Sequence, residues 1–171
     1  MSRDFPSSII PLHARTDLGP FVYYIQCGMF VKIGTSINPY NRRKQLESGN
    51  GGKAQRPDIW VGETILLASE IGSVYHEAQR HAQFAHLRHR GEWFYLTEEL
   101  ADHIEAVQFA EAMKSVELSR DIFTGLPIPE DQQPAAMLEA LSDQPAIDHE
   151  WIDQVHEWYS HELEALEKAA A

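Results

Sequence analysis

Apolar and polar positions alternate in two short segments near the start of the chain, residues 21–26 (FVYYIQ) and 29–35 (MFVKIGT). Both segments are rich in aromatic and β-branched residues, which favour strands. Cys27 and Gly28 lie between them, so the pattern predicts a β-hairpin with a two-residue turn. A third segment, residues 58–67 (DIWVGETILL), predicts another strand.

The predicted turn places Tyr23 opposite Lys32. Successive strand residues point to opposite sides of a sheet. One face of the hairpin then carries Tyr23, Ile25, Phe30 and Lys32, and the other carries Val22, Tyr24, Met29, Val31 and Ile33. The second face is the more apolar, and we expect it to face the core.

Helical patterns follow the hairpin. Asn38 and Pro39 are typical of a helix start. The patterns predict helices at residues 39–47, 69–86, 98–118 and 148–171, with a shorter one at 135–141 and an extended segment at 91–96. In the last helix the apolar residues recur at spacings of 3, 4, 4 and 3, typical of an amphipathic helix, and they are Ile152, Val155, Tyr159, Leu163 and Leu166.

These elements predict an α+β fold: a small antiparallel β-sheet, made of the hairpin plus a third strand, flanked by helices and followed by a C-terminal helical extension. The expected organisation is an irregular lead-in at residues 1–19, a domain at 20–118, a proline-rich linker at 119–147 and an acidic amphipathic helix at 148–171.

Composition excludes several classes of protein. No stretch approaches the roughly 20 apolar residues of a membrane span, and the N-terminus lacks the features of a secretory leader. Cys27 is the single cysteine, which excludes an internal disulfide and a cysteine-rich zinc site. We therefore expect a cytoplasmic protein without a membrane partner.

The net charge of −12 argues at first against a nucleic-acid partner. However, residues 1–100 contain 11 Lys and Arg against 10 Asp and Glu, whereas residues 101–171 contain 3 against 16. The acidity therefore belongs to the second part of the chain. The first part is nearly neutral and compatible with phosphate contacts.

Five landmarks follow one another between residues 20 and 97: VYYI, VKIGT, NRRKQL, the helix that carries Glu77, and GEWF. In this order they resemble the GIY-YIG nuclease domain. More particularly they resemble its phage- and prophage-associated subgroup, in which the second motif reads VKIG and the domain closes near GEWF. The resemblance covers somewhat over half of the chain.

The resemblance implies a catalytic site and a metal. Tyr23 matches the tyrosine of the first motif, Arg42 the catalytic arginine, and Glu77 the glutamate that binds a single divalent ion, Mg²⁺ or Mn²⁺. Lys32 stands where the family has its second tyrosine. A nearby cation favours phenolate, so we expect Lys32 to lower the pKa of Tyr23 and to prepare it as a proton acceptor.

His81 shares a helix face with Glu77 at i, i+4 and is a further candidate acid or base near the metal, or else a half-buried helix residue. Arg43 is the alternative catalytic arginine if the match shifts by one position. Glu92 is the alternative metal ligand. The candidate nucleic-acid contacts are Arg43, Lys44, Lys53, Arg56, Arg88 and Arg90.

The expected function is metal-dependent hydrolysis of phosphodiester bonds in DNA, in a phage, prophage or defence setting. The alternative is a catalytically weakened module of the same fold that binds nucleic acid or protein, since the second tyrosine is replaced and a late asparagine of the family has no counterpart here. The acidic helix is then a dimerisation or regulatory element, and a homodimer through residues 148–168 is a further expectation.

Overall fold

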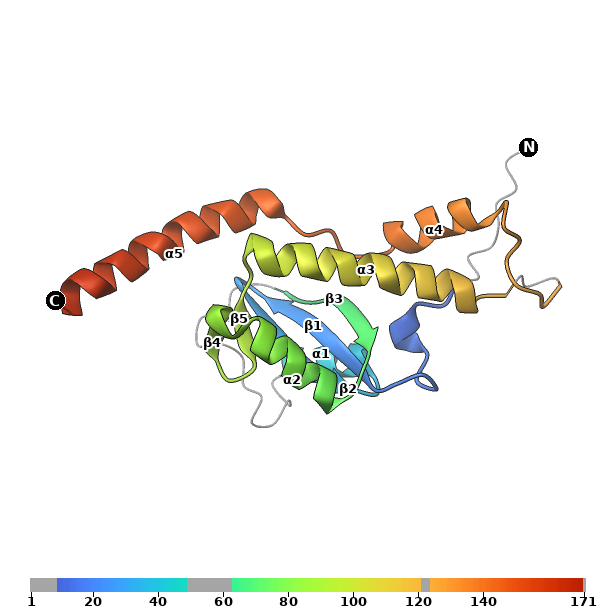
Figure 1. Cartoon of the computed structure of the whole chain (residues 1–171), viewed down its shortest axis with the longest axis horizontal. Helices are drawn as coiled ribbons and strands as arrows, with labels where there is room; N and C mark the ends of the chain where they lie inside the picture. Colours follow the sequence, from blue (N-terminus) through green and yellow to red (C-terminus); the bar gives the residue numbers. More distant parts are fainter. Residues whose placement is uncertain (1–8, 49–62, 121–123, 171) are drawn as a thin grey trace.

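A computed structural model describes residues 9–48, 63–120 and 124–170 (Figure 1). In chain order its elements are the 3₁₀ turn Leu12–Ala14, β1 (Phe21–Cys27), β2 (Phe30–Ser36), α1 (Pro39–Glu47), β3 (Thr64–Ile71), α2 (Val74–Gln83), the 3₁₀ turn Ala85–Leu87, β4 (Arg88–Arg90), β5 (Trp93–Tyr95), α3 (Glu98–Leu118), α4 (Gln133–Ser142) and α5 (His149–Ala170).

The described strands form one open antiparallel sheet in the order β3-β1-β2-β5-β4. Helices lie on both sides of it, and α5 leads away from the sheet at one end (Figure 1). The predicted α+β fold, with hairpin, third strand and C-terminal helix, is therefore confirmed. The sheet is larger than predicted, because Arg88–Arg90 forms strand β4 and pairs with β5.

The hairpin register differs from the prediction by two residues. Tyr23 pairs with Gly34, and Lys32 pairs with Ile25, so the turn residues are Gly28 and Met29. Gly28 has a φ of 60°. A two-residue turn with a positive φ at its first central position favours glycine there, which explains why the turn is centred one residue later than predicted.

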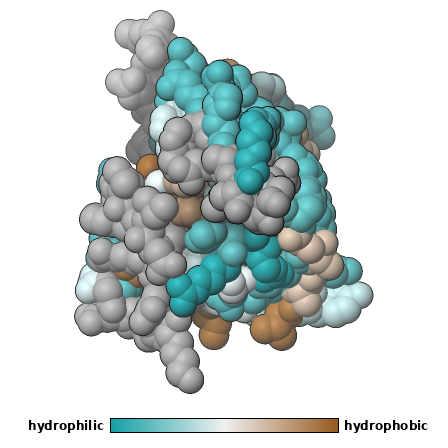
Figure 2. All heavy atoms as spheres, turned by 90° about the vertical axis from the view of Figure 1, so that its left-hand side faces the viewer, coloured by the Kyte–Doolittle hydropathy of each residue, from teal (hydrophilic) through white to brown (hydrophobic). Residues whose placement is uncertain are grey.

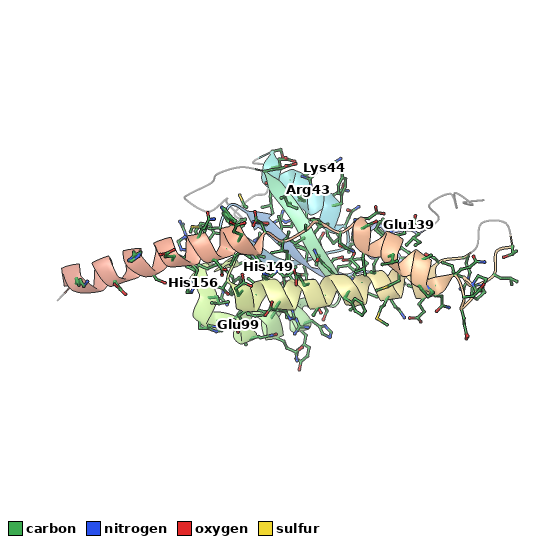
Figure 3. All side chains as sticks on the ribbon, turned by 90° about the horizontal axis from the view of Figure 1, so that it is seen from above. Arg43, Lys44, Glu99, Glu139, His149 and His156 are labelled. Carbon is green, nitrogen blue, oxygen red and sulfur yellow. The ribbon has the colours of Figure 1, made fainter. Side chains whose placement is uncertain are left out.

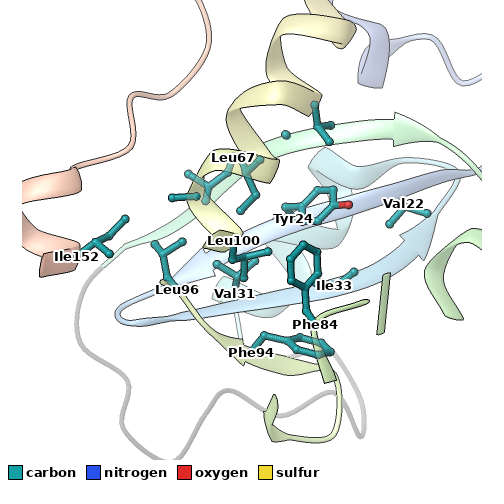
Figure 4. Packing of buried hydrophobic residues seen from close by; sticks show 14 residues of the cluster. Val22, Tyr24, Val31, Ile33, Leu67, Phe84, Phe94, Leu96, Leu100 and Ile152 are labelled. Carbon is teal, nitrogen blue, oxygen red and sulfur yellow. The ribbon is translucent and has the colours of Figure 1, made fainter. Parts of the chain in front are cut away.

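A shift of two residues leaves every side chain on its predicted face. The more apolar face packs against α3, and its residues Val22, Tyr24, Val31 and Ile33 are fully buried in the main core, as predicted (Figure 4). Phe84 follows α2 into the same cluster, and Ile152 reaches it from α5 (Figure 4). Met29 lies in the turn and joins a smaller cluster.

The opposite face of the sheet is covered by α1. Leu46 from this helix packs against Tyr23 and Ile25 in a separate buried cluster. The helix begins as predicted, since the Asn38 side chain accepts a hydrogen bond from the Asn41 amide at 3.0 Å and Pro39 takes the first helical position. Residues 39–47 are therefore fixed beside Tyr23.

The predicted helix at 69–86 is shorter in the structure. Residues 68–71 belong to β3, and α2 begins only after Ser73, whose side chain caps the helix together with His76. The predicted strand 58–67 overlaps β3 from Thr64, and residues 58–62 lie outside the described part. The lead-in, expected to be irregular, contains a 3₁₀ turn at Leu12–Ala14.

The proline-rich segment contains α4, which packs against α3 through Ala140, Ala112 and Val116. Helix α5 begins after Asp148, which accepts a hydrogen bond from the Trp151 amide at 2.9 Å. Hydrophilic side chains dominate the described surface at the end where α5 projects (Figure 2). None of the helices within the described ranges has the length and apolar character needed to cross a lipid bilayer.

Candidate active site

The Tyr23 phenol lies directly over Gly34 on the neighbouring strand. A Cβ atom at residue 34 would lie 2.5 Å from the Tyr23 hydroxyl oxygen and 2.7 Å from Cζ. Only a glycine leaves room for the ring at this distance. The side chain of Tyr23 is 2% exposed, so its hydroxyl is held within the structure rather than in bulk water.

Burial raises the pKa of Tyr23 above its usual value of 10.0. Arg42 from α1 opposes this effect with a hydrogen bond and its positive charge, whereas the negative charges of Glu92 and Glu77 add to it. Burial prevails, so Tyr23 is protonated at neutral pH. The expected lowering of the Tyr23 pKa by Lys32 is therefore not found, because the pKa is raised and Lys32 is not among the groups that affect it.

Lys32 does not lie opposite Tyr23. Its ammonium forms an ion pair with Glu92 and lies 5.7 Å from the centre of the Trp93 ring. The Lys32 side chain is 1% exposed, whereas that of Glu92 is 45% exposed. Glu92 therefore neutralises the cation that was expected to activate Tyr23. Among the two candidate arginines, it is Arg42 and not Arg43 that reaches the phenol.

Helix α2 lies along the part of β2 that β5 leaves unpaired. Strand β5 pairs with β2 only from Phe30 to Lys32. Beyond that point His81 Nε2 donates to the carbonyl oxygen of Ile33 at 2.8 Å, and the Thr35 hydroxyl donates to Glu77 Oε2 at 2.8 Å. One contact to the backbone, made by His81, and one to a side chain, made by Glu77, thus place both residues at the end of β2 that contains Gly34.

The contact with Ile33 also decides which nitrogen of His81 carries a proton. A carbonyl oxygen only accepts, so Nε2 must be protonated. In the neutral imidazole the Nδ1 atom then has a lone pair and serves as a proton acceptor. His81 Nε2 lies 3.8 Å from Glu77 Oε1, and both side chains are less than one fifth exposed.

Glu77 offers a suitable oxygen ligand for a divalent ion. Mg²⁺ usually takes one or two protein carboxylates and keeps several waters. Glu77 Oε2 is oriented by Thr35, and no cation of the protein lies within ion-pair distance apart from His81 among the described residues. The residues therefore fit a single ion held by one carboxylate and an adjacent hydroxyl.

The basic residues divide into two groups. Arg43 donates from Nη1 to the Thr64 carbonyl at 2.9 Å and to Glu47 at 3.1 Å, so it stabilises the position of α1 against β3. Lys44 lies over the Tyr40 ring at 4.6 Å and is exposed. Both project from α1, and α5 leads away from them (Figure 3).

Arg88 and Arg90 are exposed on β4. Arg88 donates to the carbonyl oxygens of Gly91 and His81 and lies 4.8 Å from the centre of the Phe94 ring. It therefore links β4 to the end of α2, next to His81. Lys53 and Arg56 lie outside the described residues.

A second polar cluster on the other side of β1 was not predicted. Tyr24 donates to Glu70 at 2.7 Å and contacts His103 Nε2 at 2.9 Å, and Arg80 binds both oxygens of Glu70 at 2.8 and 2.9 Å. Burial raises the pKa of Glu70, but hydrogen bonds from Arg80 and Tyr24 outweigh it and hold the pKa below 4.5. The cluster ties α2 to β3 and β1 and so fixes the helix that carries Glu77.

A third cluster joins α5 to α3. His149 contacts Glu98 at 2.7 Å and Glu105 at 2.6 Å through its two ring nitrogens. These contacts raise the pKa of His149 to about 9. Asp102 lies close to Glu98 and His149, and these three residues are the one group within the described ranges that brings three potential metal ligands together.

Sequence reasoning missed Glu92 as the partner of Lys32 and Thr35 as the partner of Glu77. The position of Thr35 directly after Gly34 could have indicated this contact, because neighbouring residues of a strand lie at the same end of that strand.

No protein-family model, curated protein or solved structure matches this chain.

Proposed function

We propose that the protein is a metal-dependent nuclease that hydrolyses phosphodiester bonds in DNA through a GIY-YIG-type site. The observation that carries this proposal is the convergence of Tyr23, Arg42 and Glu77 from three different elements at one end of β2. The positive charge, the hydroxyl and the carboxylate are the groups that phosphodiester hydrolysis requires.

Arg42 binds a phosphate oxygen and offsets the negative charge that develops on the phosphate. A water oxygen forms a new bond to phosphorus as the bond to the leaving oxygen breaks. The proton of this water passes to Nδ1 of His81, either directly or through the Tyr23 hydroxyl, which accepts one proton and donates its own. In this scheme Tyr23 acts as a neutral relay, in agreement with its raised pKa.

A single Mg²⁺ or Mn²⁺ ion held by Glu77 would supply positive charge to the leaving oxygen. Thr35 orients the carboxylate for this task. The exposed Lys44, Arg88 and Arg90 are the proposed contacts to the DNA backbone, together with Lys53 and Arg56. Arg43 contributes to this surface mainly by holding α1 in place.

The test is cleavage of supercoiled plasmid by the full chain with Mg²⁺ or Mn²⁺. We expect Glu77→Gln and Arg42→Gln to lower the rate at least 100-fold. Glu117→Gln is the matched control, since Glu117 is exposed and its hydrogen bonds within the described part of the chain go to Lys114 on its own helix. Cleavage that persists unchanged in Glu77→Gln, or that needs no metal, would contradict the proposal.

A second candidate function is binding without cleavage. It is favoured by the Lys32–Glu92 ion pair, which engages the lysine that was expected to activate Tyr23. A gel-shift series at several salt concentrations distinguishes the two, because phosphate contacts weaken steeply with salt. Salt-sensitive binding without metal-dependent cleavage supports this second function, and a DNA affinity that is insensitive to salt opposes both.

The remaining proposals concern the setting and the acidic helix. The resemblance supports a phage, prophage or defence setting, and the single cysteine supports action in the reducing cytoplasm. Helix α5 is anchored near its start by His149 and Ile152 and then leads away from the domain, which supports a homodimer through residues 148–168 (Figure 1). Light scattering tests the dimer: Val155→Glu should give a monomer, whereas Gln154→Glu, at an exposed neighbouring position, should not.

A further inference from the structure

A cavity of about 310 Å³ lies beside β3, at the edge of the sheet opposite to β4. It is enclosed by α1, α3, α4 and the segment around Ile9, Pro11 and His13. Apolar side chains form most of its wall, and they include Ile9, Ile65, Leu67, Ala112, Ala140 and Pro145. The volume is at the lower end of the range for small-molecule sites.

The edge of β3 beside the cavity is closed to another strand. Thr64 and Leu67 have their carbonyl oxygens bound by Arg43 and Gln108, at 2.9 and 2.8 Å. The Ser69 amide donates to Glu111 at 3.1 Å. Because side chains already bind these backbone groups, an extended peptide could not form backbone hydrogen bonds with them. The cavity therefore suits a compact ligand.

Glu111 supplies a polar group within this apolar wall. It is 2% exposed, and it accepts hydrogen bonds from His13 Nδ1 at 3.1 Å, the Ser69 hydroxyl at 3.2 Å and the Ser69 amide. A carboxylate has about four acceptor positions. Two donors bind Oε1 and one binds Oε2, so one position on Oε2 remains for a ligand.

The charges around the cavity favour a cation. Among the described residues, three carboxylates line it, those of Glu63, Glu111 and Asp143. The basic side chains of the same lining are Arg43 and His13. Arg43 is bound to Glu47 and Thr64 and lies 5.2 Å from the centre of the Tyr40 ring, and His13 is bound to Glu111. Both basic side chains of the described lining are thus already engaged, and the carboxylates of that lining outnumber them.

We propose that this cavity binds a small apolar organic cation, of the class of arylalkyl or alkyl primary amines, with its ammonium group on Glu111 and its apolar body against Ala112 and Ala140. Such a ligand fills the apolar volume and completes the hydrogen bonds of the buried carboxylate. The site is separate from Tyr23, Arg42 and Glu77, and the inference does not depend on nuclease activity.

The experiment is a titration of the full chain with benzylamine, followed by two-dimensional NMR, with benzyl alcohol and benzoate as matched probes. We expect saturable shifts at Ala112 and Ala140 for benzylamine, with an affinity at least tenfold above that of either neutral or anionic probe. Equal affinity for benzylamine and benzyl alcohol, or shifts that do not saturate, would overturn the proposal.

Two variants test the position of the ligand. Glu111→Gln keeps the shape of the side chain and should lower the benzylamine affinity roughly tenfold. Ala140→Leu fills the cavity and should abolish binding, whereas Ala135→Leu, the same change at an exposed position of α4, should leave it unchanged. If Glu111→Gln does not fold, the Ala140→Leu result decides: retained binding there places the amine elsewhere and overturns the proposal.

Discussion

Tyr23 crosses β2 so closely at Gly34 that a single methyl group on residue 34 would lie 2.5 Å from the phenol oxygen. Tyr23 is 2% exposed and packs in one cluster with Leu46 and Leu66. Gly34 is therefore required here because any larger side chain at this position would collide with the Tyr23 ring.

Gly34→Ala should displace the Tyr23 ring. We expect a loss of about 1–3 kcal/mol in the free energy of unfolding, as for an overpacked core, and a loss of about 100-fold in any cleavage rate that depends on Tyr23. Urea unfolding measures the first and plasmid cleavage the second. The control is a double-mutant cycle: in a Tyr23→Ala background the same substitution should cost much less. An equal cost in both backgrounds would show that the clash lies elsewhere.

Arg42→Gln should raise the pKa of Tyr23 further, because the arginine supplies the hydrogen bond and positive charge that oppose burial. Glu92→Gln should act in the other direction, since the charge of Glu92 raises this pKa. An NMR titration of the chain with ¹³C-labelled tyrosine measures both shifts. Shifts of the same sign in the two variants would contradict this account of the electrostatics.

Removal of the Glu92 charge should also destabilise the fold. Glu92→Gln leaves the buried ammonium of Lys32 without its carboxylate, and we expect a cost of about 1–3 kcal/mol in urea unfolding, less than for a fully buried pair because Glu92 is half exposed. The double variant Lys32→Met with Glu92→Gln should recover most of the loss. Glu99→Gln, at an exposed position, serves as the control.

Docking of α5 should depend on pH through His149. Its pKa is raised from 6.5 to about 9, so the stabilisation by Glu98 and Glu105 is complete below about pH 6.5 and is lost as the pH rises through 9. After correction for the intrinsic acceleration of amide exchange by base, the protection of residues 149–156 should therefore fall between these values. His149→Gln should remove this dependence, and His156→Gln, an exposed residue on the same helix, should retain it.

The cluster around Glu70 should contribute to stability above its depressed pKa. Glu70→Gln removes the charge that binds Arg80 and Tyr24, and we expect a cost of about 2–3 kcal/mol at pH 7. The group has a lowered pKa, so the contribution is present above the unfolded value of about 4.5 and is lost as the pH falls further. The difference in unfolding free energy between wild type and variant should therefore be full at pH 7 and should shrink as the pH is lowered below 4.5.

The elements with strong local signals were predictable from the sequence. Asn38-Pro39 and Thr97 begin helices at the expected positions, because capping depends on neighbouring residues alone. The core face of the hairpin was predictable for a similar reason, since it depends on alternation and not on register. The boundary between β3 and α2 was not, because the helix is capped by Ser73, four residues after its predicted start.

The electrostatic environment of the candidate site was less predictable. Lys32 and Glu92 are far apart in the chain, and their ion pair depends on where the β4–β5 hairpin returns to the sheet. The raised pKa of Tyr23 follows from burial by α1, which no local pattern reveals. Pairing and burial are properties of the folded chain, so a lysine near a tyrosine in sequence does not establish that it acts on that tyrosine.

Tyr23 and Tyr24 are neighbours in β1, yet one phenol faces α1 and the other faces α3. Loss or gain of a single residue in this strand would exchange two chemically similar side chains between opposite sides of the sheet and leave the composition almost unchanged. Two-residue changes preserve the arrangement. Insertions or deletions in this strand that keep the fold are therefore expected to add or remove an even number of residues.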